Sequence, residues 1–161
     1  RFEELKPKRR YTQKNEKDDQ SSIRHYDSKS DKAQLEILKL LIHNSSLAKK
    51  VPLSLLDNKL CYNIIKTIKD NSENYSNVAQ LLEFIGDSPE ERNLVASLAV
   101  DKPEKDNEHT ILTDCIRTLE NISIQNKIDT IRNEIRIVED NNQPLDKNLL
   151  QQLEELRKKV K

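Results

Sequence analysis

The sequence predicts an all-α protein, and three observations carry this prediction. Only one glycine occurs among the 161 residues. No stretch of any length alternates apolar and polar side chains as a half-buried strand does, whereas aliphatic residues recur three and four positions apart in several segments. The length fits one compact domain with appendages. We therefore expect a helical bundle subdomain, followed by a long helix and a C-terminal antiparallel helical hairpin.

Residues 1–30 have the composition of a flexible polar tether. Apolar residues are sparse there, and Lys, Arg, Asp, Ser and Gln dominate. One cluster could contact nucleic acid, because it combines cations with an aromatic ring on which a base can stack. It consists of Lys8, Arg9, Arg10 and Tyr11. A solvated tether is the simpler interpretation of the same residues, and we prefer it.

The predicted bundle covers residues 31–120, and its first helix begins near residue 30. Ser30 or Asp31 can cap this helix, since a side-chain oxygen there accepts from a free backbone N–H of the first turn. The apolar face of the helix is Ala33, Ile37, Leu38, Leu41 and Ile42. Residues 44–46 should end it. A short helical turn over 47–51 should then stop at Pro52, whose ring disfavours helical geometry in the preceding residue.

Three further helices are expected in the bundle. Asp57 and Ser76 are the predicted N-caps of the first two. Their apolar faces are Leu60, Ile64, Ile65 and Ile68, and then Val78, Leu81, Leu82 and Ile85. Gly86 suits a left-handed position at a helix end. Ser88 and Glu91 form a capping-box pattern around Pro89, so a further helix should run to about Val100.

A long helix is predicted from His109, after a charged loop over residues 101–108. Its first apolar stripe is Leu112, Cys115, Ile116, Leu119 and Ile122. A second stripe starts at Ile124, and a step of two residues turns the apolar face by about 200°. The first half should therefore pack on the bundle and the second half on another partner. Asn121, Ser123 and Asn126 are weak helix formers, and we expect a bend there.

The C-terminal residues 121–161 predict a helical hairpin. The second stripe continues through Ile128, Ile131, Ile135 and Val138, and a new one follows a break at residues 141–144: Leu149, Leu153, Leu156 and Val160. If the segments fold back on each other, the residue numbers of facing pairs must have a nearly constant sum. Four pairs satisfy this condition: Val138 with Leu149, Ile135 with Leu153, Ile131 with Leu156, and Ile128 with Val160. One apolar seam should close the hairpin.

A two-helix hairpin is too thin to bury every face of its helices, so residues beside the seam are candidates for docking a partner. Apolar anchors with arginine at the rim are typical of such surfaces. The candidates are Ile124, Arg136, Ile137, Leu145, Leu150 and Arg157. Alternatively, Ile124 and Leu150 broaden the core stripe, and single arginines such as Arg132 are merely solvated.

Composition argues against several other classes. The 28 basic and 28 acidic residues balance, so no overall field attracts nucleic acid or membrane. No apolar run reaches the length of a membrane span, and the N-terminus lacks a signal-peptide pattern, which favours the cytoplasm. Arg1 is not a natural start in a chain without methionine, so we expect a fragment of a longer protein.

Residues that could carry chemistry form no recognisable site. Cys61 and Cys115 are isolated and interpreted as buried thiols. His25, His43 and His109 lie in no metal-ligand pattern. The sequence thus predicts a segment without catalytic or metal-binding residues, and with no cofactor of its own.

The order of elements resembles the C-terminal region of bacterial replicative DNA primase. The resemblance covers residues 32 to 161 and rests on LEILKLLIHNSSLAKKV, TILTDCIRTLENISIQNKIDTIRNEI and LLQQLEELRKKVK, with the bundle between the first two. Asn44, Ser45 and Ser46 replace a proline that often follows the first helix in the family. No single motif is diagnostic.

The resemblance implies a helicase-binding domain. A bundle that stimulates the replicative helicase would precede a hairpin that docks on the N-terminal domain of the helicase hexamer. The zinc and magnesium sites of primase would lie upstream, and residues 1–10 would end its polymerase domain. Some family members also bind the tail of the single-strand-binding protein through a basic patch. Two alternatives remain: the N-terminal collar domain of a helicase or another self-associating helical adaptor, and a nucleic-acid-binding helical domain.

Overall fold

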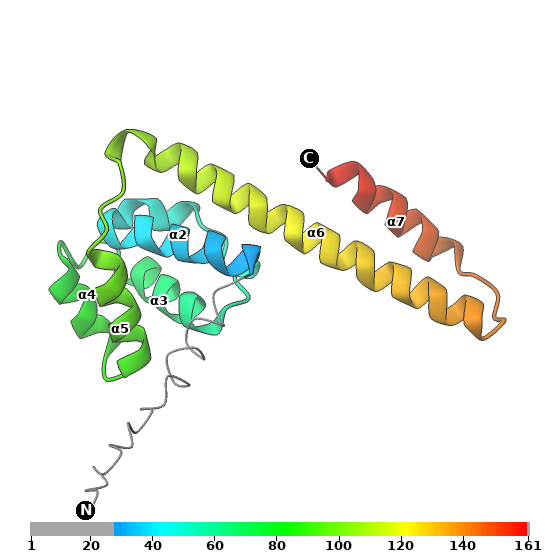
Figure 1. The fold of residues 1–161 in the computed structure, drawn as a ribbon, viewed down its shortest axis with the longest axis horizontal. Coiled ribbons are helices and arrows are strands. Elements are labelled where there is room, and N and C mark those ends of the chain that lie inside the picture. The colour runs from blue at the N-terminus through cyan, green and yellow to red at the C-terminus, as the bar shows by residue number, and fades with distance from the viewer. Residues whose placement is uncertain (1–27, 161) are drawn as a thin grey trace, which may run out of the picture.

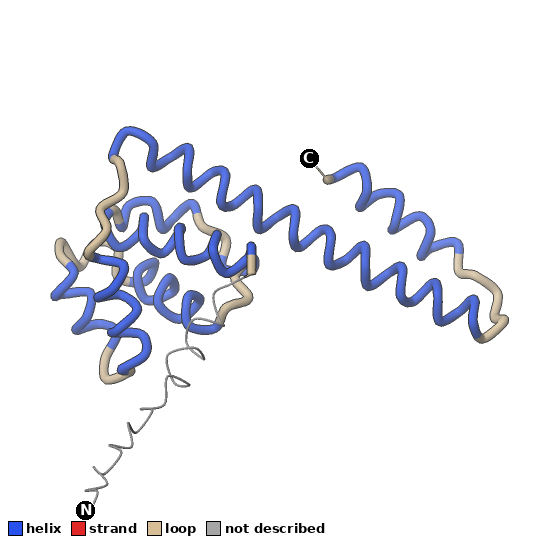
Figure 2. The backbone as a smooth tube through the Cα atoms, viewed as in Figure 1, coloured by secondary structure: helices blue, strands red, loops and turns tan. Residues whose placement is uncertain are grey.

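The computed structural model describes residues 28–160, and all its regular elements are helices. In chain order they are α2 (Lys29–His43), η1 (Ser45–Lys50), η2 (Leu53–Leu55), α3 (Lys59–Asp70), α4 (Val78–Ile85), α5 (Pro89–Ala99), η3 (Lys105–Asn107), α6 (Glu108–Asp140) and α7 (Lys147–Lys159). Within the described range no residue lies in a strand, which confirms the all-α prediction. A bundle occupies one end of the molecule, and α6 runs from it to the hairpin at the other end (Figures 1 and 2).

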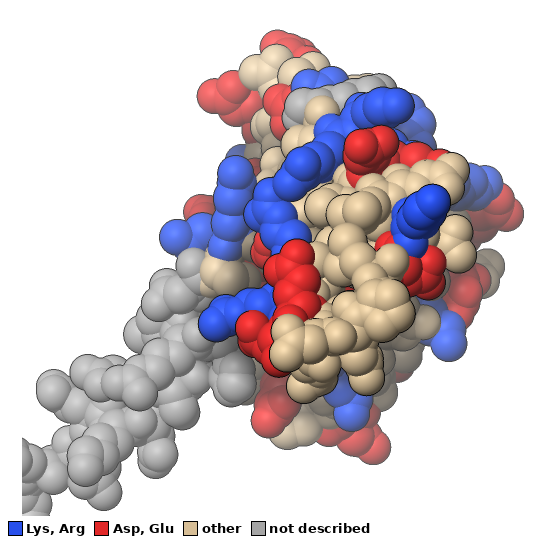
Figure 3. Space-filling view, turned by 90° about the vertical axis from the view of Figure 1, so that its right-hand side faces the viewer, with Lys and Arg blue, Asp and Glu red and all other residues tan. Residues whose placement is uncertain are grey.

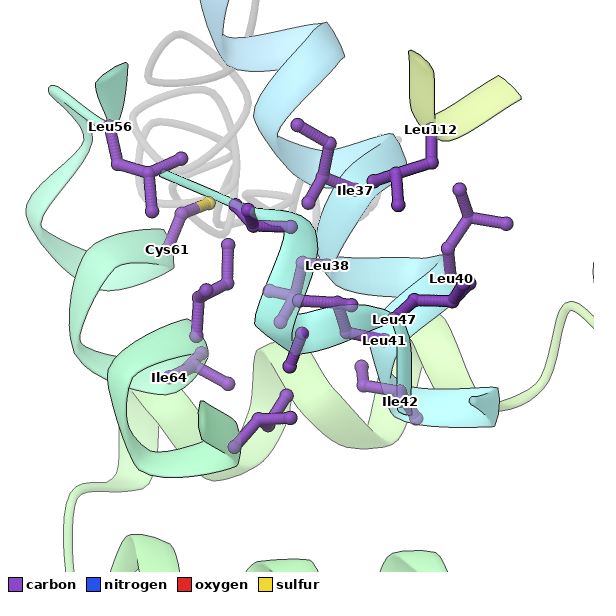
Figure 4. Packing of buried hydrophobic residues seen from close by; sticks show 14 of the residues in the cluster. Ile37, Leu38, Leu40, Leu41, Ile42, Leu47, Leu56, Cys61, Ile64 and Leu112 are labelled. Atoms are coloured by element: carbon purple, nitrogen blue, oxygen red, sulfur yellow. The ribbon is translucent and has the colours of Figure 1, made fainter. Parts of the chain in front are cut away.

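The bundle is built around α2. Its predicted apolar face is buried, and so are Leu40 and Leu47, while Leu112 reaches the same core from α6 (Figure 4). Helices α3 and α5 also pack against α2. The largest side chains with almost no exposure include Ile64, Ile65 and Ile68 of α3. Nearly all of the hydrophobic stabilisation therefore resides in the bundle rather than in the hairpin.

Several helix caps differ from the prediction by one to three residues. Ser28, rather than Ser30 or Asp31, caps α2, since its side chain accepts from the Asp31 N–H at 3.0 Å. Asn58 caps α3 by accepting from two backbone N–H groups of the first turn. Asn77, rather than Ser76, caps α4. In each case two neighbouring residues are both good caps, and the backbone angle at the helix entry selects one.

Asp57 was predicted as a cap but joins a polar network instead. Ser30 Oγ donates to Asp57 Oδ1 at 3.1 Å, and Gln34 Nε2 donates to the same oxygen. Gln34 is fully buried, and its side-chain carbonyl accepts from the Asn58 N–H at 3.1 Å. This network holds the N-terminal ends of α2 and α3 together, because a buried amide left unpaired would be costly.

The connection between α4 and α5 confirms one prediction and corrects another. Gly86 has φ +76°, as a glycine at a helix end allows. Pro89 begins α5, but the Ser88 side chain makes no cap hydrogen bond. Glu91 accepts from Asn63 of α3 at 3.2 Å instead of closing a capping box. The expected capping box is therefore absent.

Helix α6 is one uninterrupted element of 33 residues. Residues 121–126, where a bend was expected, do not break the helix: α6 continues through them as α-helix, and Figure 1 draws it as one continuous ribbon. The change of apolar stripe is real: Leu112 and Leu119 belong to the bundle core, whereas Ile128 and Ile131 belong to a separate core with α7. Tertiary packing on both sides outweighs the weak helix propensity of the intervening residues. No helix within residues 28–160 has an apolar stretch that could cross a bilayer.

Candidate protein-docking site

The hairpin is closed by most of the predicted seam, but two of its residues, Val138 and Val160, are not among those that pack together. Ile128, Ile131 and Leu153 are buried, and the partly buried residues that pack on them are Ile124, Ile135, Leu149 and Leu156. Val160 does not pair with Ile128, because α7 ends at Lys159 and Val160 is 44% exposed. Ile124 packs on the end of this core that is nearest the bundle. A side chain held in this packing is less available to bind a partner protein.

The turn of the hairpin is held by local hydrogen bonds. Gln143 N donates to Val138 O, and Asn142 N donates to Glu139 O, both at 3.1 Å. With Asn142 at φ +52°, this pattern is a Schellman motif in which asparagine takes the left-handed position. Asp146 then caps α7. Leu145, predicted near the tip of the hairpin, lies between the Schellman motif and the N-cap of α7, and its side chain is partly exposed.

Ile137 and Leu150 are exposed as predicted, at 59% and 43%. They do not form one patch. At about 100° per residue, Ile137 lies within about 20° of Asn126 and Thr130 around the α6 axis. Those two residues line a cleft between the hairpin and the bundle. Ile137 is therefore on the side of the hairpin that faces the cleft.

Leu150 is on the opposite side of the hairpin. It lies about 160° from Gln152 and about 180° from Lys159 around the α7 axis, and both of these line the cleft. Arg157 is within about 20° of Leu150. On α6, Arg132 and Arg136 lie about 140° and 180° from the cleft residue Lys127.

We call this side the outer face and define it as Leu150, Arg132, Arg136 and Arg157. Its arginines are exposed, and Arg132 pairs weakly with Asp129 at 3.9 Å. Glu139 and Glu154 lie beside it in the helical register, so its charge is mixed. Figure 3 looks onto the hairpin end of the molecule and shows uncharged surface bordered by both basic and acidic side chains. An exposed leucine framed by arginines is suited to anchoring a partner protein.

The cleft lies where the hairpin meets the bundle and has a volume of about 560 Å³. Leu119 and Ile131 are its buried apolar residues, and Leu55, Ile122 and Leu156 line it with partly exposed side chains. Its charged lining residues are Asp57, Lys127, Glu155 and Lys159. Sequence reasoning did not find this cleft, because it depends on the angle between bundle and hairpin.

A second groove lies along the N-terminal part of α6, near the C-terminal end of α7. Its apolar lining consists of Leu112, Ile116 and Ile124. Around them lie the basic or imidazole side chains Lys50, His109, Arg117 and Lys159, and one carboxylate, Glu120. Lys50 Nζ and His109 Nδ1 are 3.2 Å apart. These residues come from three elements, so no local sequence signal could have grouped them.

Residues 28–160 contain no group of three or more His, Cys, Asp or Glu side chains placed to hold a metal ion. Cys61 is buried as predicted, but Cys115 is only partly buried. Burial raises the pKa of Cys61 to about 12 and that of Cys115 to about 11, which keeps both thiols protonated and unreactive near neutral pH.

Comparison with known families decides the identity. The model of the family described as DNA primase DnaG DnaB-binding matches residues 34–159, which includes both the bundle and the hairpin. The chain belongs to this family. No curated protein and no solved structure matches the chain.

As a DnaB-binding domain of primase, the chain has the replicative helicase as its partner. The matched family is one of primase, whereas a collar domain would belong to the helicase itself. The candidate nucleic-acid cluster Lys8, Arg9, Arg10 and Tyr11 lies outside the described residues, as does His25.

Proposed function

We propose that this domain recruits primase to the replicative helicase by docking its hairpin on the N-terminal domain of the helicase hexamer. The observation that carries the proposal is the match to the DnaB-binding family together with the exposed Leu150 on a hairpin that projects from the bundle. A projecting hairpin can reach a partner while the bundle core remains undisturbed. Primer synthesis would then take place beside freshly unwound template.

We assign the helicase contact to the outer face. Leu150 would insert into an apolar pocket of the helicase, and Arg136 and Arg157 would bind carboxylates at its rim. Such a small surface gives a modest affinity for one contact. Several primases around one hexamer would gain from avidity. The domain would act in the bacterial cytoplasm, at the replication fork.

Within this proposal the bundle, residues 31–120, stimulates the helicase, and the hairpin, residues 121–161, holds the domain in place. Residues 1–30 would connect the domain to the polymerase domain of primase, where zinc and magnesium would be bound. Their polar composition suits a tether that lets the catalytic part reach the unwound strand.

The test of stimulation is the unwinding rate of the helicase at increasing concentrations of the chain. We expect the rate to rise to a plateau with the wild-type chain. Leu150→Asp should require at least about tenfold more protein for half of the effect, since a buried anchor contributes more than about 1.4 kcal/mol, but it should reach the same plateau.

Gln151→Asp is the matched control, because Gln151 is an exposed neighbour on α7 outside the outer face. It should behave like the wild-type chain. If the complex forms but the unwinding rate never changes, stimulation is wrong while recruitment stands. If Gln151→Asp is as defective as Leu150→Asp, the outer face is not the contact.

A second candidate function concerns the groove along α6. An apolar strip beside Lys50, Arg117 and Lys159 suits an acidic peptide with aliphatic side chains. We propose that this groove binds the tail of the single-strand-binding protein, which some members of the family bind through a basic patch, although the sequence alone indicated no such cluster here. Arg117→Glu should abolish binding of a tail peptide measured by fluorescence anisotropy. Lys102→Glu, an exposed lysine outside the groove, is the control. Equal binding by both variants would place the peptide elsewhere.

A further inference from the structure

The hairpin contributes side chains to the groove along α6. Lys159, the last residue of α7, lines this groove together with Ile124. Ile124 also packs on the small core of the hairpin, which consists of Ile128, Ile131 and Leu153. The remaining lining residues come from η1 and from the N-terminal half of α6. The groove is therefore completed by an element, α7, that belongs to the hairpin rather than to the bundle.

Cations are distributed along the length of the groove. From His109 to Ile124 the axis of α6 rises about 22 Å, which is the length of about seven residues of extended peptide. Lys50 contacts His109 at one end, with Nζ and Nδ1 3.2 Å apart. Lys159 lies toward the other end, because α7 packs along the part of α6 that begins at Ile124. Arg117 belongs to the stretch of α6 between these two ends.

The lining favours an acidic peptide over nucleic acid. Its floor is aliphatic, formed by Leu112, Ile116 and Ile124, and its single carboxylate is Glu120. Alternate side chains of an extended peptide point to opposite sides, so aliphatic residues can face the floor while carboxylates face the cations. A single strand of nucleic acid is typically held by aromatic rings on which bases stack. The imidazole of His109 is the one aromatic ring in this lining.

We infer that an acidic peptide bound in this groove holds α7 against α6 and so stabilises the hairpin. The inference rests on the peptide-binding groove of the proposed function and adds a means of regulating it. When α7 is packed on α6, the peptide contacts Lys159 as well as Arg117. When α7 detaches, Lys159 leaves with it. The peptide binds the packed state more tightly and therefore shifts the population toward that state.

The hairpin is the part of the domain that such a ligand can influence. Its core is formed by two helices, whereas the bundle core draws residues from every α-helix between α2 and α6. Local opening is easiest where few apolar contacts are buried. Leu150 and Arg157 of the outer face also belong to α7, so a partner bound there favours the same packed state. Each ligand should then tighten the binding of the other, because coupling between two sites is reciprocal.

The test is amide hydrogen exchange of the full chain with and without a labelled peptide in which four aspartates alternate with three leucines. At saturating peptide, exchange in α7 should slow by up to about fivefold, the upper range for one exposed ion pair. The slowing equals the ratio of the peptide affinities of the packed and detached states. Exchange in α3, which belongs to the bundle core, should not change.

Lys159→Glu and Lys158→Glu are the matched variants. They change the charge equally at neighbouring exposed residues of α7, and of the two lysines Lys159 is the one that lines the groove. In fluorescence anisotropy Lys159→Glu should weaken peptide binding by about fivefold, and at saturation it should abolish the slowing in α7. Lys158→Glu should behave like the wild-type chain. Equal behaviour of the two variants, or no slowing in the wild-type chain, would overturn the coupling while the groove stands.

Arg117→Glu separates failure of the coupling from failure of the groove. Arg117 lines the groove but lies outside the hairpin core, so its substitution should prevent peptide binding and leave exchange in α7 of the free chain unchanged. No peptide binding by the wild-type chain, or retained binding by Arg117→Glu, would overturn the groove and this inference with it. Complete displacement of the peptide by a thymidine oligonucleotide would overturn the choice of an acidic peptide as the ligand.

Discussion

Ile137 and Leu150 are both exposed hairpin side chains, yet they lie on opposite sides of the hairpin. Ile137 shares the cleft side with Asn126 and Thr130, and Leu150 shares the outer face with Arg157. A partner that covers one of them in a flat interface leaves the other in water. Docking on a helicase should therefore be sensitive to only one of the two positions.

Substituting each of the two residues in turn should show which side of the hairpin binds the helicase. Leu150→Asp should weaken binding to the helicase hexamer by at least about tenfold, because an aspartate cannot enter an apolar pocket. Ile137→Asp should change the affinity by less than about twofold. Titration by biolayer interferometry on immobilised helicase gives both values. The reverse ranking would move the contact to the cleft side.

The arginines of the outer face should act through direct contacts rather than long-range attraction. Arg136→Glu combined with Arg157→Glu should speed dissociation from the helicase several-fold, because each guanidinium loses a carboxylate at the rim. The association rate should change less, since Glu139 and Glu154 keep the surrounding charge mixed. Surface plasmon resonance separates the two rates. Unchanged dissociation would remove these arginines from the interface.

The hairpin has a small core of its own, the seam, which is separate from the bundle core. We therefore expect the hairpin to be less stable than the bundle. Leu153 is buried among Ile128 and Ile131, so Leu153→Ala should cost about 2 kcal/mol of local stability. Amide hydrogen exchange followed by mass spectrometry should show faster exchange in α7. Peptides from α3 should keep their protection, because α3 shares no core with Leu153. Equal loss in both would mean that bundle and hairpin unfold together.

The hairpin turn depends on one left-handed residue. Asn142 has φ +52°, a region that costs an alanine about 1 kcal/mol more than an asparagine or glycine. Asn142→Ala should therefore lower the stability of the hairpin by about 1 kcal/mol, and Asn142→Gly should change it by less. Exchange rates of the α7 amides measure both effects. Asn141→Ala is the control, since its φ of −88° suits any residue.

Alkaline pH should destabilise the protein partly through Cys61. Its pKa is about 12 when folded and 9.0 for the free side chain, because burial penalises the thiolate. The unfolded chain therefore loses its proton first, and this contribution to stability, fully present below pH 9, is lost as pH rises toward 12. Urea unfolding of the wild-type protein should weaken more between about pH 8 and about pH 10.5 than that of Cys61→Ala. Parallel pH profiles would contradict this account.

Helix periodicity was sufficient to predict the fold and most of the seam. Regular geometry fixes which residues share a face, and it correctly placed Ile128, Ile131 and Leu153 inside the hairpin. The predicted N-cap residues were wrong by one to three positions. At the start of α2, for example, Ser28, Ser30 and Asp31 can all accept from a free backbone N–H, and tertiary context decides which of them does. The weak helix formers around residues 121–126 do not interrupt α6, since packing on both sides keeps this segment helical.

The candidate site was only partly predictable. Exposure of Ile137 and Leu150 followed from their positions beside the seam, but a list of residues beside a stripe does not say which of them share a side of the hairpin. Predicting the cleft and the groove would have required knowledge of the angle between α6 and the bundle. Their lining residues come from segments such as η2 and α7 that are far apart in the sequence.

The mass of the complex with the replicative helicase tests the central claim most directly. Gel filtration with light scattering should show the helicase hexamer carrying the wild-type chain and the Gln151→Asp control. With Leu150→Asp at the same concentration, the two proteins should elute separately, while its circular dichroism spectrum remains that of the wild type. A complex of equal mass with Leu150→Asp would contradict the assignment of the outer face. No complex with the wild-type chain would contradict recruitment through this domain.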